Sequence, residues 1–287
     1  MKSAKKTAAI HDISGIGKCS LTAIIPVMSA MGIQVCPVPT AVLSAHTGYS
    51  NFVMKDLTDF IGKALENYKT LGTSFDCIYS GFLASADQIE HCADFFDAYP
   101  GALKVVDPVM GDNGKRYKTI TDELCTKIKM LVKKADLITP NLTEAALLLD
   151  EDCPVNGLRA NELKSWLVRL SQLSENTRYI VITGAQTSDG KIWSAGYDRS
   201  TGGFWRVGSS YVPMQYSGCG DLFTAVLVGG LMSEDSLPIA LDRAAHFTGL
   251  AIKTTYSYGI SKNDGILFEP QLAWLNNYSE LGNFEPI

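Results

Sequence analysis

The residues best suited to chemistry form the stretch Ser217–Asp221, which reads Ser-Gly-Cys-Gly-Asp and runs directly into the apolar segment Leu222–Val228. Two glycines separated by one residue allow a sharp turn that exposes consecutive backbone N–H groups, and the apolar segment predicts a helix with those donors at its positive end. Such a turn can bind a phosphate. Asp221, in the first helical turn, could then accept a proton from a hydroxyl that attacks a nucleotide's terminal phosphate.

The same residues also fit a simpler structure, in which a glycine turn precedes a buried helix and Asp221 is a first-turn residue favoured by the helix dipole. Short glycine motifs are common and give many false matches. The phosphoryl-transfer interpretation therefore requires Asp221 to lie at the ligand-binding edge of a sheet. The same interpretation would be wrong if Asp221 formed an ion pair with an unrelated part of the molecule.

Composition limits the classes of function. The chain has 287 residues, of which 46% are hydrophobic and 19% charged, so we expect one globular α/β domain over residues 1–287 with a large core. The net charge of −5 and the scattered lysines and arginines argue against a nucleic-acid surface and favour a small-molecule substrate. No apolar run approaches the length of a membrane span, and the basic N-terminus precedes too short an apolar run for a signal peptide.

The seven cysteines are odd in number, are spread along the chain and contain no C-x-x-C pair, which indicates reduced thiols. We therefore expect a cytoplasmic protein. The histidines have no cysteine or histidine at metal-binding spacing, so zinc is not indicated. Cys219 would lie at a helix N-terminus, where thiol pKa values fall, and we expect it to be oxidation-sensitive or simply the small residue that fits.

Short apolar runs alternate with helical patterns, which indicates βαβ units and a mostly parallel sheet. Ser85-x-x-Gln88 matches a capping box at the start of one helix. A hairpin around Asp198–Gly202 should add antiparallel strands. The expected strands are Thr7–His11, Gln34–Val38, Cys77–Ser80, Lys104–Asp107, Leu137–Thr139, Tyr179–Thr183, Lys191–Tyr197 and Gly203–Val207.

Polar side chains follow four of these strands. In an open parallel sheet, ligands bind beyond the carboxyl ends of the strands, so four polar strand ends predict one site at that edge, although polar residues begin loops in any protein. The four strand ends carry His11-Asp12, Asp107, Thr139-Pro140-Asn141 and Thr183-Gly184.

The loop Ser14–Ser20 resembles a nucleotide motif but fails two tests. A Walker A loop needs a glycine where Asp12 stands and Ser or Thr where Cys19 stands. A dinucleotide fingerprint needs an acidic residue about 20 positions on, and none occurs between Asp12 and Asp56. We interpret the segment as a substrate-side loop, with Asp12 and Ser14 as substrate-binding candidates, or as a plain tight turn.

Asp107 ends a strand and begins the polar loop Asp107–Tyr117. Its carboxylate could bind Mg²⁺ directly or through water, or it could cap a turn before proline. The glycines of this loop allow it to fold over a nucleotide as a small lid, so Asp112 and Tyr117 are nucleotide-binding candidates. Lys115 and Arg116 could meet phosphate or serve only as exposed charges.

Glu144 begins a helix after the strand that ends at Thr139. It could reach the same Mg²⁺ through water, or it could be a first-turn glutamate that stabilises the helix dipole. In Ser44–Tyr49 a hydroxyl, an imidazole and an aromatic ring could grip a flat polar substrate, so Thr47 and Gly48 are further substrate candidates. His46 carries no catalytic assignment.

These motifs, in this order, resemble the pyridoxal/pyridoxamine kinases of the ribokinase superfamily, which salvage vitamin B6. The resemblance covers nearly the whole chain, and its most specific part is the combination of Asp-Pro-Val-Met-Gly-Asp, Thr-Pro-Asn-x-x-Glu and Gly-x-Gly-Asp. The segments that carry it are the first-strand loop, Ser44–Tyr49, Ser80–Phe82, Asp107–Asp112, Thr139–Glu144, Val181–Gly184 and Gly218–Asp221.

The resemblance implies a three-layer α/β/α sandwich and ATP-dependent phosphorylation of the 5′-hydroxymethyl group of a pyridoxine-type ring. It implies Asp221 as base and the amides of Gly218, Cys219 and Gly220 as the anion hole. It also implies Mg²⁺ at Asp107 and Glu144, Thr139 and Thr183 along the nucleotide phosphates or a monovalent cation such as K⁺, and Thr47 at the ring. Family members are usually homodimers.

Two departures concern the ring that is bound. Phe82 stands where many relatives have a tyrosine, which keeps stacking and loses a hydroxyl. The first loop, His11-Asp12-Ile13-Ser14, is similar to the hydroxymethylpyrimidine kinase branch. A hydroxymethylpyrimidine kinase is therefore one alternative, and a non-catalytic pyridoxal phosphate-binding protein is another. A dinucleotide-dependent oxidoreductase is disfavoured by the missing acidic residue.

Overall fold

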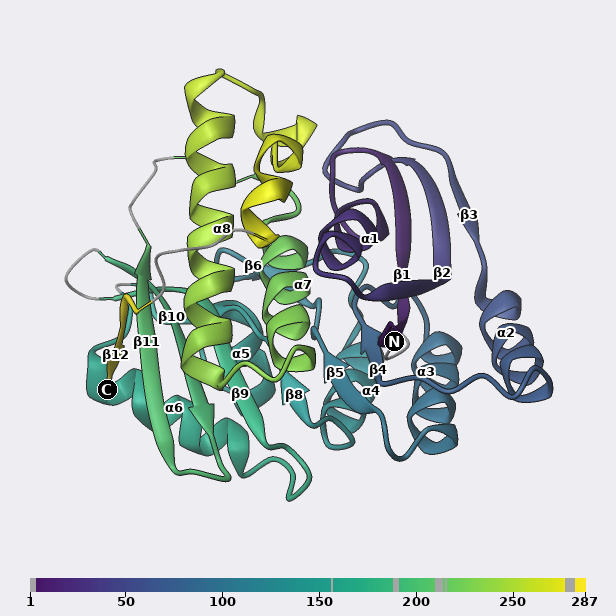
Figure 1. The fold of residues 1–287 in the computed structure, drawn as a ribbon, viewed down its shortest axis with the longest axis horizontal. Coiled ribbons are helices and arrows are strands. Elements are labelled where there is room, and N and C mark those ends of the chain that lie inside the picture. The colour runs from purple at the N-terminus through teal and green to yellow at the C-terminus, as the bar shows by residue number, and fades with distance from the viewer. Residues whose placement is uncertain (1–3, 156, 188–190, 210–213, 215, 277–281) are drawn as a thin grey trace.

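The computed structural model is built on one ten-stranded sheet, in the order β12-β11-β10-β9-β8-β5-β4-β1-β2-β3 (Figure 1). It describes residues 4–155, 157–187, 191–209, 214, 216–276 and 282–287. The strands are β1 (Lys6–Ile16), β2 (Gln34–Ala45), β3 (Met54–Asp56), β4 (Cys77–Ser80), β5 (Leu103–Val106), β8 (Leu137–Ile138), β9 (Tyr179–Gln186), β10 (Ile192–Asp198), β11 (Gly203–Ser209) and β12 (Phe284–Pro286).

The six central strands, from β2 to β9, pair in parallel, and β3, β10, β11 and β12 add antiparallel edges. The prediction of a mostly parallel sheet extended by an antiparallel hairpin is confirmed. The edge strands β3 and β12 were not expected, because each has only three residues and no buried alternating pattern. A separate two-stranded ladder, β6 (Gly111–Asp112) and β7 (Lys115–Arg116), forms the loop after β5.

Helices cover both faces of the sheet, which confirms the three-layer α/β/α architecture. One core cluster packs against α2 to α6, and the other packs against α1, α7 and α8 (Figure 1). The helices are α1 (Leu21–Ala30), α2 (Thr58–Thr70), α3 (Ala86–Ala98), α4 (Asp122–Val132), α5 (Leu142–Leu149), α6 (Ala160–Ser171), α7 (Cys219–Met232) and α8 (Leu237–Ser257), with short 3₁₀ turns η1 (Lys262–Asp264) and η2 (Glu269–Asn276). Among the described residues, no helix combines the length and apolar character needed to cross a membrane.

Strands β1 and β2 run well past the ends expected for them. β1 pairs with β4 only through Ile10, but its pairing with β2 continues to Ile16 opposite Ala45. The extended parts, Ile13–Ile16 and Val42–Ala45, form with β3 a ribbon that we call the flap (Figure 1). Part of the expected substrate-side loop is therefore strand.

The flap begins at a break in strand register beside Asp12. Between His11 and Ile13, β1 advances two residues while β2 advances three, from Pro39 to Val42. Such bulges bend a strand and redirect its side chains, and they are frequent next to active sites. The bulge thus separates the buried body of the sheet from the flap at the point where the predicted polar residues begin.

Candidate active site

The Gly-x-Gly-Asp segment forms the turn and helix start that its sequence predicts. Gly218 caps α7 with φ +85°, a left-handed conformation that favours glycine. The first helical hydrogen bond runs from the Leu222 N–H to the Gly218 carbonyl. The amides of Gly218, Cys219, Gly220 and Asp221 precede it and have no partner within the helix, so they form the positive end of α7.

Asp221 is anchored by His11, in the middle of β1, and by Ser20, just before α1. Its Oδ1 lies 3.0 Å from the His11 Nε2, and its Oδ2 accepts a hydrogen bond of 2.8 Å from the Ser20 N–H. Asp221 is therefore in an ion pair, but the partner belongs to a strand that delivers residues to the same edge of the sheet. The pair belongs to the site, so the condition set by the sequence is met.

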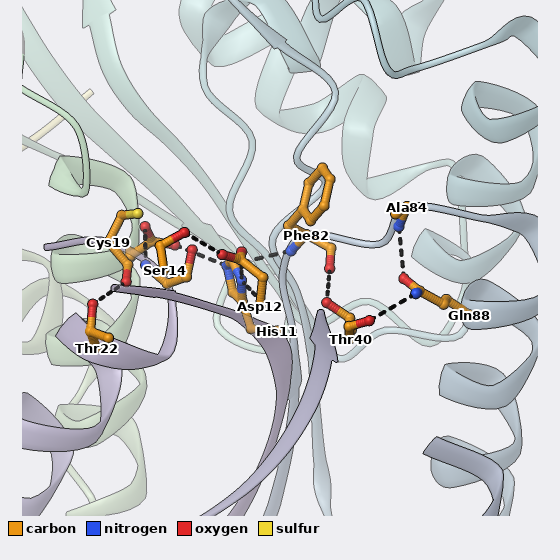
Figure 2. Close-up of polar contacts among 11 residues, drawn as sticks. His11, Asp12, Ser14, Cys19, Thr22, Thr40, Phe82, Ala84 and Gln88 are labelled. Carbon is orange, nitrogen blue, oxygen red and sulfur yellow. Dashed lines mark hydrogen bonds and ion pairs between the residues drawn. The ribbon is translucent and has the colours of Figure 1, made fainter. Parts of the chain in front are cut away.

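Asp12 and Ser14 join the same cluster. The Asp12 Oδ1 lies 2.9 Å from the His11 Nδ1, and the Asp12 Oδ2 accepts a hydrogen bond of 2.8 Å from the Ser14 hydroxyl (Figure 2). The side chains of Asp12 and Ser14 are buried. Burial would raise the pKa of Asp12, but the hydrogen bonds and charge of His11 outweigh it and lower that pKa. Asp12 is therefore linked to Asp221 through His11, and Ser14 is linked to it through Asp12 and His11.

Phe82 is connected to this cluster through its backbone. Its N–H lies 3.4 Å from the His11 Nε2, and its carbonyl oxygen accepts a hydrogen bond of 3.1 Å from the Thr40 hydroxyl (Figure 2). The fully buried Gln88 holds the following loop: its Oε1 accepts from the Ala84 N–H, and its amide donates to the Thr40 carbonyl. The predicted capping box is therefore only half formed, since the Ser85 hydroxyl accepts from the Gln88 N–H while the Gln88 side chain points to β2.

Asp107 lies at the end of β5, buried beside α7. Its Oδ2 is 3.4 Å from the Thr224 hydroxyl, which also lies 3.2 Å from that of Thr139. Burial and the nearby charge of Asp221 raise the pKa of Asp107 to about 7. Among the described residues its side chain makes one long hydrogen bond, which leaves most of the oxygen lone pairs available, so the buried carboxylate fits a hard cation such as Mg²⁺.

Glu144 has the structural role that the sequence left open. It completes a capping box with Asn141: its Oε2 accepts from the Asn141 N–H and its Oε1 accepts from the Met110 N–H. Burial and the charge of Asp107 raise its pKa well above the ordinary value. Each oxygen keeps a further lone pair, so a water-mediated contact to a cation at Asp107 is compatible with this cap.

The β6–β7 ladder places the other nucleotide candidates near this region. Asp112 is partly buried, and desolvation raises its pKa, while Tyr117 is 41% exposed. Arg116 pairs with Asp122. Thr183 lies in β9 and bridges to Asn141, beside Thr139 along the sheet edge.

Thr47 and Gly48 lie at the tip of the flap and are exposed. The tip is attached to η1, because the His46 Nε2 donates 2.8 Å to the Asn263 carbonyl and the Tyr49 hydroxyl donates 2.7 Å to Asp264. The backbone carbonyl of Lys262, also in η1, accepts a hydrogen bond from the N–H of Ser217, next to the glycine turn. The flap tip is thus tied to the start of α7 through η1, while the structure gives Thr47 and Gly48 no direct contact with Asp221.

Sequence reasoning missed His11 and Thr224. His11 was visible only as a polar residue at a strand end, and its partner stands 210 positions away. Thr224 carries a clearer signal, since it is a hydroxyl in an otherwise apolar helix, three residues after Asp221 and on the same face. The expected low pKa of Cys219 is wrong: burial and then the charge of Asp221 raise the pKa of this thiol to about 12.

Comparison with known proteins places this site in a family. The profile of the family described as phosphomethylpyrimidine kinase matches residues 19–266, which is most of the chain. The chain belongs to this family. The prediction of a kinase of the ribokinase superfamily, similar to pyridoxal kinases, is confirmed.

Solved structures agree with this family. A candidate phosphomethylpyrimidine kinase from Bacteroides thetaiotaomicron, crystallised with pyridoxal, is 43% identical with a TM-score of 0.94, over 99% of this chain and 100% of that one. Pyridoxal kinase from Lactobacillus plantarum is 28% identical with a TM-score of 0.86, over 96% and 97% of the two chains.

A curated relative, the hydroxymethylpyrimidine/phosphomethylpyrimidine kinase of Bacillus subtilis, is 28% identical over 64% of this chain and 66% of its own length. A pyridoxal kinase relative from Schizosaccharomyces pombe is matched over 65% of its length. The chain thus spans just under two thirds of these two relatives.

Proposed function

We propose that this protein transfers the terminal phosphoryl group of ATP to the 5′-hydroxymethyl group of pyridoxal, pyridoxamine or pyridoxine, with residues 1–287 acting as one kinase domain. The observation that carries the proposal is the position of Asp221, a carboxylate in the first turn of α7 beside three amides that have no partner within the helix. A base next to an anion site is the arrangement that phosphoryl transfer to an alcohol requires.

In this reaction the hydroxyl oxygen of the substrate attacks the terminal phosphorus, the bond from phosphorus to the bridging oxygen of ADP breaks, and the hydroxyl proton passes to Asp221. The amides of Gly218, Cys219 and Gly220 donate to the transferred phosphoryl group, where charge is spread over its oxygens. Asp12, Ser14 and Phe82 hold the ring, and Thr47 and Gly48 close over it when the flap tip is engaged. Asp112, Tyr117, Thr139 and Thr183 line the nucleotide side.

Asp107 and Glu144 would hold Mg²⁺, and K⁺ is the proposed monovalent cation near Thr139 and Thr183. When bound, Mg²⁺ supplies positive charge that neutralises the phosphates. Among the described residues no three His, Cys, Asp or Glu side chains form a ready-made metal site. This suits Mg²⁺, which is commonly held by one or two carboxylates together with substrate phosphates.

Hydroxymethylpyrimidine is the second candidate substrate. It is supported by the description of the matching family and by the Bacillus subtilis relative, whereas pyridoxal is supported by the Bacteroides thetaiotaomicron structure. The reaction is the same, and the two six-membered rings differ in the number of ring nitrogens and in their substituents. The alternative of a non-catalytic pyridoxal phosphate-binding protein is disfavoured because it assigns no function to the carboxylates of Asp221 and Asp107.

The test is an ADP-release assay with ATP and a panel of B6 vitamers and hydroxymethylpyrimidine, with and without Mg²⁺. We expect Mg²⁺-dependent turnover, with the higher kcat/KM for a B6 vitamer. A higher value for hydroxymethylpyrimidine would select the second candidate, and tight vitamer binding without ADP release would reject the kinase. We also propose a homodimer, and a monomeric mass in solution would reject that part.

A further inference from the structure

The His11 ring fills a buried space beside Gly81, where no side chain competes with it. The imidazole is 3% exposed, and a Cβ atom added to Gly81 would lie only 1.9 Å from its Cδ2. Any side chain at position 81 would therefore displace the ring. The pairing of β1 with β4 ends at Ile10 opposite Ser80, so Gly81 lies beside His11 and leaves room for its ring to reach Asp221 on α7.

The contacts of the ring indicate that both of its nitrogens carry protons. Nδ1 faces the Asp12 carboxylate at 2.9 Å and Nε2 faces the Asp221 carboxylate at 3.0 Å, and a carboxylate bonds only to a donor. The N–H groups of Asp12 and Phe82 also approach Nδ1 and Nε2, at 2.9 and 3.4 Å, which would suit an unprotonated ring. The two carboxylates, Asp12 buried and Asp221 with a side chain 15% exposed, are charged acceptors that outweigh these neutral amide contacts and favour the imidazolium.

The carboxylates around His11 also favour a doubly protonated ring. The carboxylates that act on His11 come from two elements, Asp12 on β1 and Asp221 on α7, and Asp107 at the end of β5 is close enough for His11 to lower its pKa. Burial alone would lower the pKa of His11, but Asp221 and Asp12 raise it to about 10. An imidazolium here offsets the repulsion between Asp221 and an incoming triphosphate.

Asp221 is held from two sides by one segment of chain. His11 donates to Oδ1 and the Ser20 N–H donates to Oδ2, so the plane of the carboxylate is fixed relative to the β1–α1 connection. Because His11 also bonds to Asp12, a movement of Asp12 on the substrate side is transmitted to Asp221 through one rigid ring. His11 and Asp12 lie before Cys19, outside the residues that the family profile matches, whereas Asp221 lies inside them.

We propose that His11 is a positioning residue that aims the Asp221 carboxylate at the substrate hydroxyl and couples it to Asp12. The inference rests on the proposed function of Asp221 as the base. In the transfer step His11 keeps both of its protons: the substrate O–H bond breaks, its proton goes to Asp221, and the hydrogen bond from Nε2 continues to hold the protonated carboxyl group.

Two substitutions separate the two bonds of His11. His11→Gln places an amide N–H near the former Nε2 and keeps a donor for Asp221, while His11→Asn places one near Nδ1 and keeps a donor for Asp12 only. We expect His11→Asn to lower kcat by about 10- to 100-fold with a smaller change in the KM for ATP, because misplacing a catalytic group by about 1 Å has effects of this size. His11→Gln should retain more activity than His11→Asn.

The matched control is His91→Gln on α3, whose ring is 33% exposed and lies 3.7 Å from Asp94 on the same helix. It should leave kcat unchanged. Equal losses in His11→Gln and His11→Asn, or kcat values for both within about twofold of the control, would overturn the proposal.

A second measurement does not depend on turnover. Nitrogen-15 NMR of histidine-labelled protein should show His11 as a doubly protonated ring that does not titrate near pH 6.5, and Asp221→Asn should shift its Nε2 resonance. A neutral His11, or a resonance insensitive to Asp221→Asn, would refute the pair even if the variants fail to fold. If the wild-type protein transfers no phosphoryl group to either ring, the proposed function fails, while the NMR result still decides whether His11 holds Asp221.

Discussion

Gly218→Ala is expected to disrupt the start of α7 and with it the reaction. Gly218 has φ +85°, and an added Cβ would lie 2.2 Å from the Lys18 carbonyl oxygen, a backbone atom of the β1–α1 connection. The left-handed conformation costs an alanine about 1–2 kcal/mol. Because Cβ atoms essentially never come closer than 3.0 Å to such an atom, α7 and the β1–α1 connection must also separate by about 0.8 Å.

The separation acts on the groups that carry the chemistry. The same connection supplies the Ser20 N–H to Asp221, and the amides of the α7 start move with Gly218. We expect the free energy of unfolding to fall by at least about 1–2 kcal/mol and kcat to fall by about 100-fold, as for a misplacement near 1 Å. Urea unfolding and the ADP-release assay measure the two effects.

Gly220→Ala is the matched control for stability. It lies in the first turn of α7 with a negative φ, and a Cβ there meets nothing within 4 Å. Alanine favours a helix over glycine by up to about 1 kcal/mol, so the unfolding free energy should be unchanged or higher. If Gly218→Ala unfolds at the same urea concentration as Gly220→Ala and turns over at the wild-type rate, the described geometry of the glycine turn is wrong.

Three further predictions concern charge. Asp107→Asn should raise the Mg²⁺ concentration for half-maximal activity by about 10-fold or more, since a carboxylate ligand is lost, and an unchanged Mg²⁺ titration would remove Asp107 from the metal site. The pKa of His11 in the folded protein is raised from 6.5 to about 10, so its ion pairs stabilise the fold fully below pH 6.5, and this contribution is lost as the pH rises through 10. The difference in unfolding free energy between wild type and His11→Gln should therefore shrink between pH 7 and 10. A constant difference over this range would contradict the raised pKa. Cys219, with a pKa of about 12, should react slowly with iodoacetamide at pH 8 in the folded protein and at an ordinary rate after unfolding. Rapid folded-state labelling of Cys219, measured by mass spectrometry, would contradict the raised pKa.

The body of the fold could be predicted from local patterns, but the flap could not. The runs in β4 and β8 are short and buried, and β5 ends in the buried Val105 and Val106; such short, largely apolar runs indicate parallel strands. Ser14-Gly15-Ile16 instead has the composition of a turn, and it becomes strand only because β2 continues alongside it to Ala45. Pairing with a distant partner, rather than propensity, determines that part of the structure.

The candidate site divides in the same way. Asp221 and Asp107 follow from their places at the start of a helix and the end of a strand, because the topology brings all such positions to one edge. The link from His11 to Asp221 depends on a contact across 210 positions and on the absence of a side chain at Gly81, which no local pattern encodes. The structural use of Glu144 was equally open, since a capping glutamate and a metal-associated one look alike in sequence.

The central claim is that Asp221 takes the proton of the hydroxyl that is phosphorylated. Asp221→Asn keeps the size of the side chain and an oxygen for the Ser20 N–H, but it removes the basic carboxylate. Rapid mixing of ATP, Mg²⁺ and pyridoxal with excess enzyme should show transfer slowed by about 100-fold or more, with ATP affinity nearly unchanged. Transfer by Asp221→Asn at close to the wild-type rate would contradict the account.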